Sequence, residues 1–359
     1  MDNASDDTIT FNEKGECSYC THALNVLNTY YYPFIKDDSK VKRVIEKVKN
    51  ESTNQKYDCM MGISGGLDSS YVAYLGTVKY GLRVLAFHVD DGFDTEISKR
   101  NIKRLGELPN LDLKMITPDA KQFCELTRAF LKAGVPNIAM PQDNVLFAEL
   151  YKAALKYKIK YFFTGVNYSL ESILQKGNTH PNDDSVNIKD IFNRFGRGRI
   201  DKLSFISKFK KDCYRLFNGI ENINLLDMVD YKRENAIKEL HDGIGFEYYG
   251  SKHLENDLTK FIQLYWFPKK FNVDKRKSHL SSMIVSGQLT RDEALEMMKQ
   301  PMYNEEDMKA TIQDILERLD LTEAEFKNIM DAPSHQHTDY KTSSYPRVKQ
   351  AIKNVLGRK

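Results

Sequence analysis

The sequence predicts a doubly wound, mostly parallel α/β sheet that follows a small Cys-containing N-terminal segment and precedes a helical C-terminal region. Three observations predict this class. In the middle of the chain, short apolar runs alternate with helix-like patterns. Polar clusters follow three of these runs, at 62–70, 88–94 and 165–167, where parallel strands form a ligand crevice at their carboxyl ends. The C-terminal part carries helical patterns only.

Two apolar runs, 58–63 and 82–89, predict the first pair of strands. A serine–glycine turn follows the first run and opens a helical pattern that extends to about Tyr80. The second run is rich in branched residues, as in a strand that is buried on both faces. The same reasoning predicts further strands at 111–116, 159–164 and 223–230 and further helices at 95–107, 119–132, 143–157 and 232–242. Because 168–202 is rich in glycine, asparagine and aspartate, we expect a loop or an insertion there.

Helix start signals organise the C-terminal region. Thr290 with Glu293, and Thr322 with Glu325, have the spacing of a capping box, in which two side chains satisfy backbone N–H groups at the start of a helix. The final residues, 347–359, are basic. We expect them to form either a frayed helix or a docking segment.

Composition and charge limit the classes of protein. Of the 359 residues, 41% are hydrophobic and 29% are charged, which is typical of a globular protein. The net charge of +3 gives no broad basic field of the kind that indicates a nucleic-acid partner. No apolar run is long enough to span a membrane. The polar, acidic start lacks a secretory signal and the five cysteines suit a reducing compartment, so we expect a cytoplasmic protein.

The loop after the first predicted strand carries the chemistry. Glycines let backbone N–H groups approach an anion, and the start of a helix adds a partial positive charge. Serine hydroxyls add hydrogen bonds, and Asp68 is suited to hold Mg²⁺, which neutralises phosphates. The predicted nucleotide-binding residues of this loop are Ser64, Gly65, Gly66, Asp68, Ser69 and Ser70. The chain lacks the Walker and G-x-G-x-x-G spacings, which argues against kinase-like and hydride-transfer activities.

Two further strand ends are candidates for the same site. Asp90 follows the second predicted strand, and Asn167 ends the turn after the fourth. We expect both residues to border the nucleotide. A plain turn needs only glycine with aspartate or asparagine, so a structural role is the alternative for each of them.

The segment 64–70, SGGLDSS, resembles the PP-loop of the ATP pyrophosphatase superfamily, which has the adenine nucleotide alpha hydrolase-like fold. Members of this superfamily cleave ATP between the α- and β-phosphates and transfer AMP to an oxygen of the substrate. Together with residues 9–20, the turn 165–167 and the basic block 248–295, the loop makes the chain similar to the N-acetyl sugar amidotransferase family of bacterial surface-polysaccharide biosynthesis. The resemblance rests above all on the block 248–295, because the PP-loop alone marks only the superfamily.

This resemblance implies three parts: an N-terminal segment, 1–50, with a partial zinc-ribbon-like cysteine pair; a PP-loop ATP pyrophosphatase domain, 51–245; and a basic, substrate-binding helical region, 246–359. It implies ATP and Mg²⁺ as cofactors. The implied reaction converts an acetamido group on a nucleotide-linked or nonulosonic sugar into an acetamidino group, in lipopolysaccharide or O-antigen biosynthesis. Adenylylation makes the amide oxygen a leaving group, and ammonia then displaces AMP.

The ammonia is expected to come from another protein or from solution, and a partner protein is the prediction. None of the five cysteines lies in a G-x-C-x-G elbow, and Asp2 follows Met1 where a glutaminase with an N-terminal nucleophile would need cysteine. The resemblance implies partner subunits similar to the glutaminase and cyclase pair of histidine biosynthesis.

The basic block offers cations for an anionic sugar and its phosphates. The expected substrate-binding residues are Lys252, His253, Lys269 and Arg276, and the expected catalytic residues are Asp68, Lys270 and Arg276. Arg276 is the candidate for a bidentate contact with a carboxylate or phosphate. For each lysine taken singly, a solvated surface charge is the alternative.

Cys17 and Cys20 form a Cys-x-x-Cys pair. The family usually carries two such pairs near its N-terminus, so the resemblance implies Zn²⁺ at this position. Two thiolates do not complete a tetrahedral zinc site. We therefore expect either that the start of the sequence has been trimmed or misassigned, or that the metal is absent or shared.

A tRNA-modifying PP-loop enzyme, of the thiolase or lysidine-synthetase type, is the alternative function. Such enzymes share the loop, and the basic run 268–279 offers contacts to RNA phosphates. The low net charge argues against this alternative. A third hypothesis, a scaffold that binds nucleotide without catalysis, would be favoured by ATP binding without pyrophosphate release.

Overall fold

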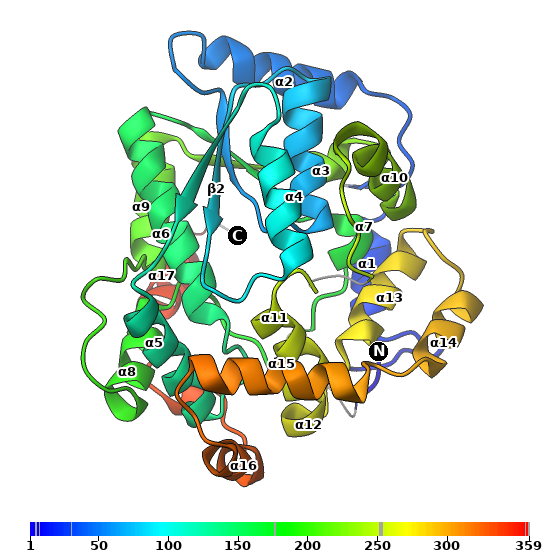
Figure 1. Cartoon of the computed structure of the whole chain (residues 1–359). Coiled ribbons are helices and arrows are strands. Elements are labelled where there is room, and N and C mark those ends of the chain that lie inside the picture. Colours follow the sequence, from blue (N-terminus) through cyan, green and yellow to red (C-terminus); the bar gives the residue numbers. More distant parts are fainter. Residues whose placement is uncertain are drawn as a thin grey trace.

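A five-stranded parallel sheet forms the centre of the computed structural model, which describes residues 1–3, 6, 8–29, 31–175, 177–250, 254–355 and 357 (Figure 1). The strand order is β3-β2-β1-β4-β5. The strands are β1 (Cys59–Gly62), β2 (Val84–Val89), β3 (Leu111–Ile116), β4 (Tyr161–Thr164) and β5 (Glu221–Asn224). All four neighbouring pairs are parallel. The predicted α/β class is therefore confirmed.

Helices cover both faces of the sheet. The helices of residues 18–244 are α1 (Ser18–Val26), α2 (Ser39–Glu51), α3 (Leu67–Tyr74), α4 (Glu96–Gly106), α5 (Ala120–Ala133), α6 (Met140–Tyr157), α7 (Tyr168–Glu171), α8 (Ser185–Phe195), α9 (Lys208–Asn218) and α10 (Arg233–Ile244). The C-terminal helices are α11 (Asp257–Phe261), α12 (Phe267–Phe271), α13 (Lys275–Val285), α14 (Arg291–Lys299), α15 (Glu305–Arg318), α16 (Glu323–Asp331) and α17 (Tyr345–Val355). No helix among the described residues is long and apolar enough to cross a membrane.

Strand β2, which lies between β1 and β3, shows why the sheet is covered on both sides. Val84 and Ala86 pack into one hydrophobic cluster with residues of α2, α3, α4 and α10. Leu85 and Phe87 alternate with them and pack into a second cluster with α6. Because neighbouring side chains of a strand point to opposite faces, a continuous apolar run predicts exactly such double burial. Figure 1 shows α3, α4 and α10 on one side of the sheet and α6 on the other.

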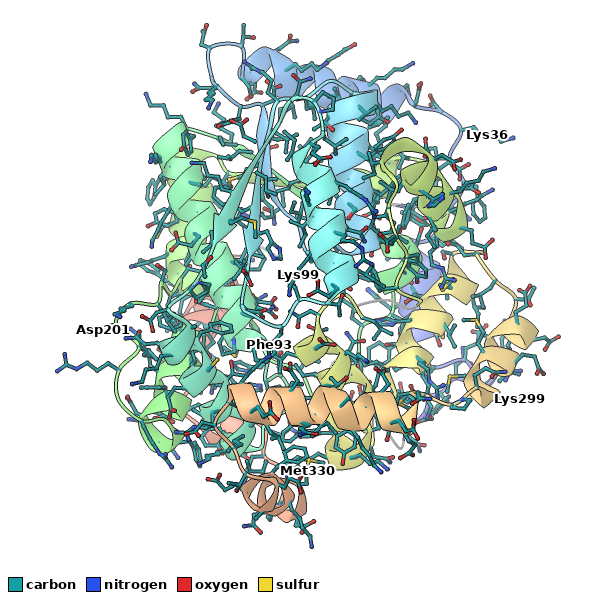
Figure 2. The ribbon with its side chains drawn as sticks, in the orientation of Figure 1. Lys36, Phe93, Lys99, Asp201, Lys299 and Met330 are labelled. Atoms are coloured by element: carbon teal, nitrogen blue, oxygen red, sulfur yellow. The ribbon has the colours of Figure 1, made fainter. Side chains whose placement is uncertain are left out.

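The C-terminal helices share a third cluster with α5 and α8. Trp266 is fully buried there, and its indole N–H donates to the carbonyl oxygen of Val135 at 3.0 Å. Phe93, in the loop after β2, joins this cluster beside α15 (Figure 2), where Arg318 donates to the carbonyl oxygen of Gly92. The C-terminal region is thus packed against the carboxyl edge of the sheet.

Two sequence expectations need correction. The stretch 168–202 is not a plain loop, because it contains α7 and α8; Asp184 caps α8, whose buried face packs in the third cluster. The predicted strand 223–230 is also too long. Pairing with β4 ends at Asn224, and a 3₁₀ turn over Leu225–Met228 buries the remaining apolar residues. A buried turn and a buried strand both produce an apolar run, so the pattern alone does not separate them.

Both predicted capping boxes are present, at the starts of α14 and α16. The C-terminal tail forms α17, which docks on α9: the Tyr345 hydroxyl and the Lys349 ammonium both donate to Asp212, at 3.1 and 2.5 Å. Of the two alternatives for this tail, the described part corresponds to a docking segment.

His337 fastens the chain that leads to α17. Its ring stacks on His180 with centroids 4.8 Å apart. Its Nδ1 lies 2.8 Å from Oδ1 of Asn187, and its Nε2 accepts the N–H of Asn137 at 3.3 Å. Burial, together with the nearby His180, lowers the pKa of His337 to about 3.

This contact makes stability depend on pH. In the unfolded chain the pKa of a histidine is about 6.5, so the unfolded state binds the proton more readily than the folded state does. The stability that neutral His337 contributes is fully present above about pH 6.5 and falls by up to about 1.4 kcal/mol per pH unit toward pH 3. Urea unfolding at pH 7, 5.5 and 4.5 should show a smaller loss for His337→Gln than for wild type. Equal losses would contradict this assignment.

Candidate active site

The loop between β1 and α3 needs glycine because α4 packs against it. Gly65 has a φ of +73°, and a Cβ built there would lie 2.6 Å from Oγ of Ser98 and 2.8 Å from its carbonyl oxygen. Asn101 of α4 donates to the Gly65 carbonyl oxygen at 3.3 Å. A side chain at position 65 is excluded by both the backbone conformation and the space.

The serines of the loop hold its shape. Oγ of Ser69 accepts the N–H of Ser64 at 3.2 Å, and Oγ of Ser64 accepts the N–H of Gly66 at the same distance. Ser70 is fully buried and donates to the carbonyl oxygen of Gly66 at 2.6 Å. Ser70 therefore supports the loop from behind, whereas Ser64 and Ser69 line the cavity in front of it.

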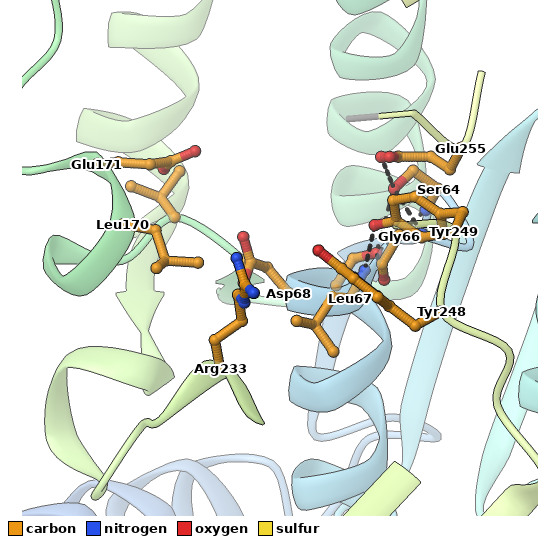
Figure 3. Close-up of a pocket in the computed structure, with 13 residues that line it drawn as sticks. Ser64, Gly66, Leu67, Asp68, Leu170, Glu171, Arg233, Tyr248, Tyr249 and Glu255 are labelled. Atoms are coloured by element: carbon orange, nitrogen blue, oxygen red, sulfur yellow. Dashed lines mark hydrogen bonds between the residues drawn. The ribbon is translucent and has the colours of Figure 1, made fainter. Parts of the chain in front are cut away.

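A cavity of about 220 Å³ opens in front of this loop (Figure 3). Its wall includes the loop residues Ser64, Gly66, Asp68 and Ser69, the segment after β4 with Gly165 and Glu171, Arg233 at the start of α10, and Tyr248, Tyr249 and Glu255. The cavity lies at the carboxyl ends of β1 and β4. From β1 the sheet is extended on one side by β2 and β3, and on the other side by β4 and β5, so the order of strands changes direction between β1 and β4. Open α/β sheets bind ligands at such a point.

Asp68 is held by a residue that the sequence analysis did not identify. The hydroxyl of Tyr231 donates to Oδ1 of Asp68. Tyr231 is fully buried, and Gln288 donates to its carbonyl oxygen at 3.1 Å. Burial and the charge of Asp68 raise the pKa of Tyr231 well above its usual value, so the phenol stays protonated and remains a donor. A carboxylate that is fixed in this serine–glycine loop is suited to serve as a ligand of Mg²⁺.

Two groups from the segment before α11 touch the loop. The hydroxyl of Tyr249 accepts the N–H of Leu67 at 2.8 Å. Oε1 of Glu255 accepts a hydrogen bond from the Ser64 hydroxyl at 3.1 Å, while its Oε2 is buried and has no hydrogen-bond partner among the described residues. Burial raises the pKa of Glu255, and the charge of Asp68 adds to this effect.

Arg233 is the only cationic side chain among the described residues that line the cavity. Its backbone N–H donates to Oε1 of Gln288 at 3.1 Å, and its Nε is buried without a hydrogen-bond partner in the described part of the chain. A buried guanidinium donor beside the serine–glycine loop that follows β1 is suited to an anionic ligand.

Asn167 and Asp90 lie at strand ends, as predicted, but their side chains are engaged in local turns. Asn167 is buried; its Oδ1 accepts the N–H of Leu170 at 2.9 Å, and its Nδ2 donates to the Gly165 carbonyl oxygen at 3.1 Å. It caps α7 and shapes the turn that lines the cavity. Oδ1 of Asp90 accepts the N–H of Gly92 at 3.1 Å. Neither side chain lines the cavity.

The structure does not bring the predicted catalytic cations to the cavity. The ammonium of Lys270 donates to the carbonyl oxygens of Ile329 and Ala332, at 2.6 and 2.8 Å, and so caps the end of α16. Arg276 pairs with Asp274 at 2.9 Å and donates to the Gln300 carbonyl oxygen. The partners of both residues lie within the C-terminal helical region.

Among the described residues, none of the other predicted substrate-binding residues is found in the wall of the cavity. Lys269 is exposed in the last turn of α12 and is absent from the cavity wall. Lys252 and His253 lie outside the described residues. The cation that does line the cavity, Arg233, lies in a helix start with no motif to mark it.

Cys17 and Cys20 lie together at the start of α1, with their sulfur atoms 3.4 Å apart. Burial, with the neighbouring Cys17, raises the pKa of Cys20 to about 11. No group of three or more His, Cys, Asp or Glu side chains among the described residues could hold a metal ion. Two sulfurs do not fit a tetrahedral Zn²⁺ site.

The C-terminal region matches a known family model. Residues 255–354 match the model described as "LPS biosynthesis protein WbpG-like, C-terminal domain". The match begins at Glu255 of the cavity and covers most of the block 248–295, on which the resemblance to a surface-polysaccharide family rests. A comparison with curated protein sequences finds no significant match.

Several solved structures are similar over most of their length. They include NMN synthetase from Francisella tularensis (14% identity, 80% of this chain and 98% of that chain, TM-score 0.34) and NH3-dependent NAD synthetase from Campylobacter jejuni subsp. jejuni NCTC 11168 (16%, 75% and 100%, 0.32). A third is the U34-tRNA thiolase NcsA from Methanococcus maripaludis (15%, 72% and 80%, 0.31). Likeness at this level carries no conclusion about activity. The family match is the informative finding: residues 255–354 are similar to the C-terminal domain of WbpG-like LPS biosynthesis proteins, and in this chain they follow a parallel α/β sheet.

Proposed function

We propose that this protein is an ATP-dependent amidotransferase of surface-polysaccharide biosynthesis. It adenylylates the acetamido oxygen of an N-acetylated sugar, nucleotide-linked or nonulosonic, and replaces that oxygen with ammonia nitrogen to give an acetamidino group. The observation that carries the proposal is the composition of the cavity. One wall is the PP-loop with Asp68, and another is Glu255, the first residue matched by the LPS biosynthesis domain model.

The proposed chemistry has two steps. The acetamido oxygen attacks the α-phosphorus of ATP, a P–O bond forms, and the bond to pyrophosphate breaks, which leaves an imidate–AMP. Ammonia then attacks the imidate carbon, the C–O bond breaks, and AMP departs with the former amide oxygen. Such a reaction depends on positioning and on stabilisation of charge rather than on a protein nucleophile.

The residues of the cavity suit these tasks. The Ser64 and Ser69 hydroxyls, together with loop N–H groups other than those of Ser64, Gly66 and Leu67, would bind the outer phosphates, and Arg233 would add positive charge. Asp68, oriented by Tyr231, would hold Mg²⁺, and Glu255 lines the same cavity. When bound, Mg²⁺ supplies charge neutralisation for the phosphates.

Ammonia is proposed to come from partner subunits of the glutaminase and cyclase type. Cys59 illustrates why no thiol of the sheet is a candidate nucleophile: it is fully buried in β1, and burial raises its pKa. A buried thiol of raised pKa is inert as a nucleophile.

The alternative, a tRNA-modifying enzyme, loses its main support in the structure. The basic run 268–279 suggested contacts to RNA phosphates, but four of its cations contact other residues of the protein, while Lys269 is exposed. Lys270 caps α16, Arg276 pairs with Asp274, Lys277 pairs with Asp2, and Lys275 lies over the Phe267 ring. A titration with tRNA at low and high salt tests this alternative, because phosphate contacts predict binding that weakens steeply with salt.

A direct assay tests the proposed reaction. The protein is incubated with ATP, Mg²⁺, ammonium and candidate N-acetylated nucleotide sugars, and products are analysed by mass spectrometry. We expect AMP, pyrophosphate and a sugar whose mass has changed by the replacement of O with NH. Formation of ADP instead of AMP would overturn the proposal.

Substitutions in the loop should abolish pyrophosphate release. Asp68→Ala removes the expected Mg²⁺ ligand, and Ser64→Ala removes a hydroxyl that faces the phosphates, so each variant should retain the fold and lose at least about 100-fold in rate. Pyrophosphate release and circular dichroism are measured on the same preparations. Full activity in both variants would remove the loop from the mechanism.

Tyr231→Phe should lower activity because Asp68 loses the hydrogen bond that orients it. The variant keeps the ring but loses a hydrogen bond to a charged group, which is worth about 1.5–3 kcal/mol, or roughly 10- to 100-fold. We expect a higher Mg²⁺ concentration for half-maximal pyrophosphate release. Tyr71→Phe is the matched control, because Tyr71 donates to Glu239 away from the cavity. Identical Mg²⁺ dependence in the two variants would show that Tyr231 is only structural.

A further inference from the structure

We propose that Glu255 makes the binding of polyphosphate at this loop conditional on a divalent cation. Its carboxylate lies on the loop, where it repels metal-free polyphosphate and serves as a ligand for the cation that accompanies the phosphates. This inference rests on the proposed function of the loop as a polyphosphate site. It adds the requirement for a metal and a residue that enforces it.

The position of the carboxylate is the first observation. A Cβ built on Gly66 would lie 2.5 Å from Oε1 of Glu255, so the carboxylate lies directly over the glycine that leaves the loop open. The same oxygen accepts the Ser64 hydroxyl at 3.1 Å. A phosphate that approaches this hydroxyl therefore meets a negative charge at contact distance, and the low dielectric of a partly enclosed site strengthens the repulsion.

The backbone holds Glu255 in this position. Its carbonyl oxygen accepts the N–H and the hydroxyl of Thr95, both at 3.1 Å. The next residue, Asn256, donates to Oδ1 of Asp91 at 3.1 Å, and the N–H of Asp257 donates to the Phe93 carbonyl oxygen at 2.7 Å. These contacts fasten Glu255 to the loop after β2, so the main chain that carries the carboxylate is fixed beside the PP-loop.

The second carboxylate oxygen points to a cation. Glu255 is only 8% exposed, and its Oε2 is buried without a hydrogen-bond partner in the described part of the chain. Burial of a carboxylate oxygen without a hydrogen-bond partner is unfavourable unless the oxygen binds a cation or a proton.

The donor set fits Mg²⁺ that arrives with a phosphate ligand. Mg²⁺ is typically held by one or two carboxylates together with substrate phosphates and water, rather than by an all-protein cage. Asp68 and Glu255 line the same cavity. The described residues offer no cluster of three or more metal-ligating side chains, which agrees with an ion that binds together with its phosphates.

Isothermal titration calorimetry with inorganic pyrophosphate, in Mg²⁺ or in EDTA, tests the proposal without relying on turnover. We expect wild type to bind pyrophosphate at least about tenfold more tightly with Mg²⁺ than in EDTA. Glu255→Gln, which keeps the shape but removes the charge, should bind metal-free pyrophosphate at least about tenfold more tightly than wild type. In the variant, Mg²⁺ should then improve binding less.

Glu247→Gln is the matched control. It makes the same chemical change in the same segment, but Glu247 pairs with Arg100 and Arg104 at 2.6 and 2.8 Å, away from the cavity wall. It should bind pyrophosphate as wild type does. Electron paramagnetic resonance of Mn²⁺ with pyrophosphate should also show less bound ion for Glu255→Gln than for Glu247→Gln.

Each outcome is decisive. Wild type that binds metal-free pyrophosphate as tightly as the Mg²⁺ form overturns the inference without any variant, even if Glu255→Gln fails to fold. Unchanged or weaker metal-free binding in a folded Glu255→Gln overturns it as well. If wild type binds neither pyrophosphate nor ATP under any condition, the proposed function fails, and not this inference alone.

Discussion

The packing of α4 against the loop after β1 is the constraint on which the site depends. Ser98 and Ile102 leave no room for a side chain at Gly65, where the backbone has a φ of +73°, and Asn101 donates to the carbonyl oxygen of the same residue. The serines then stabilise this shape through bonds to backbone atoms. A crossover helix, and not the loop alone, therefore determines where an anion can bind.

The two acidic side chains of the cavity depend on different parts of the chain. Asp68 is held by Tyr231, which lies 163 residues further along, in the segment after β5. Glu255 is held through its backbone by the loop after β2 and reaches Ser64 across 191 residues. Because the carboxyl ends of parallel strands meet at one edge of the sheet, segments that are distant in sequence converge on the same small volume.

Local patterns are sufficient to predict what is local. The buried strand 84–89, the serine–glycine loop between a strand and a helix, and both capping boxes each consist of consecutive residues, and the structure contains all of them. Tyr231, Arg233 and Glu255 carry no local signal, since only the fold brings them to the loop. The cations chosen from the basic block illustrate the opposite error: charge alone suggested Arg276, but its partner Asp274 lies two residues away in the same helix start.

Glu255 both lines the cavity and is the first residue matched by the model of the C-terminal domain. The boundary between the two regions therefore runs through the site itself. Recombination that exchanged the C-terminal domain for that of a relative would also replace one wall of the cavity. The two regions of the chain therefore constrain each other at this cavity, and neither can diverge there independently of the other.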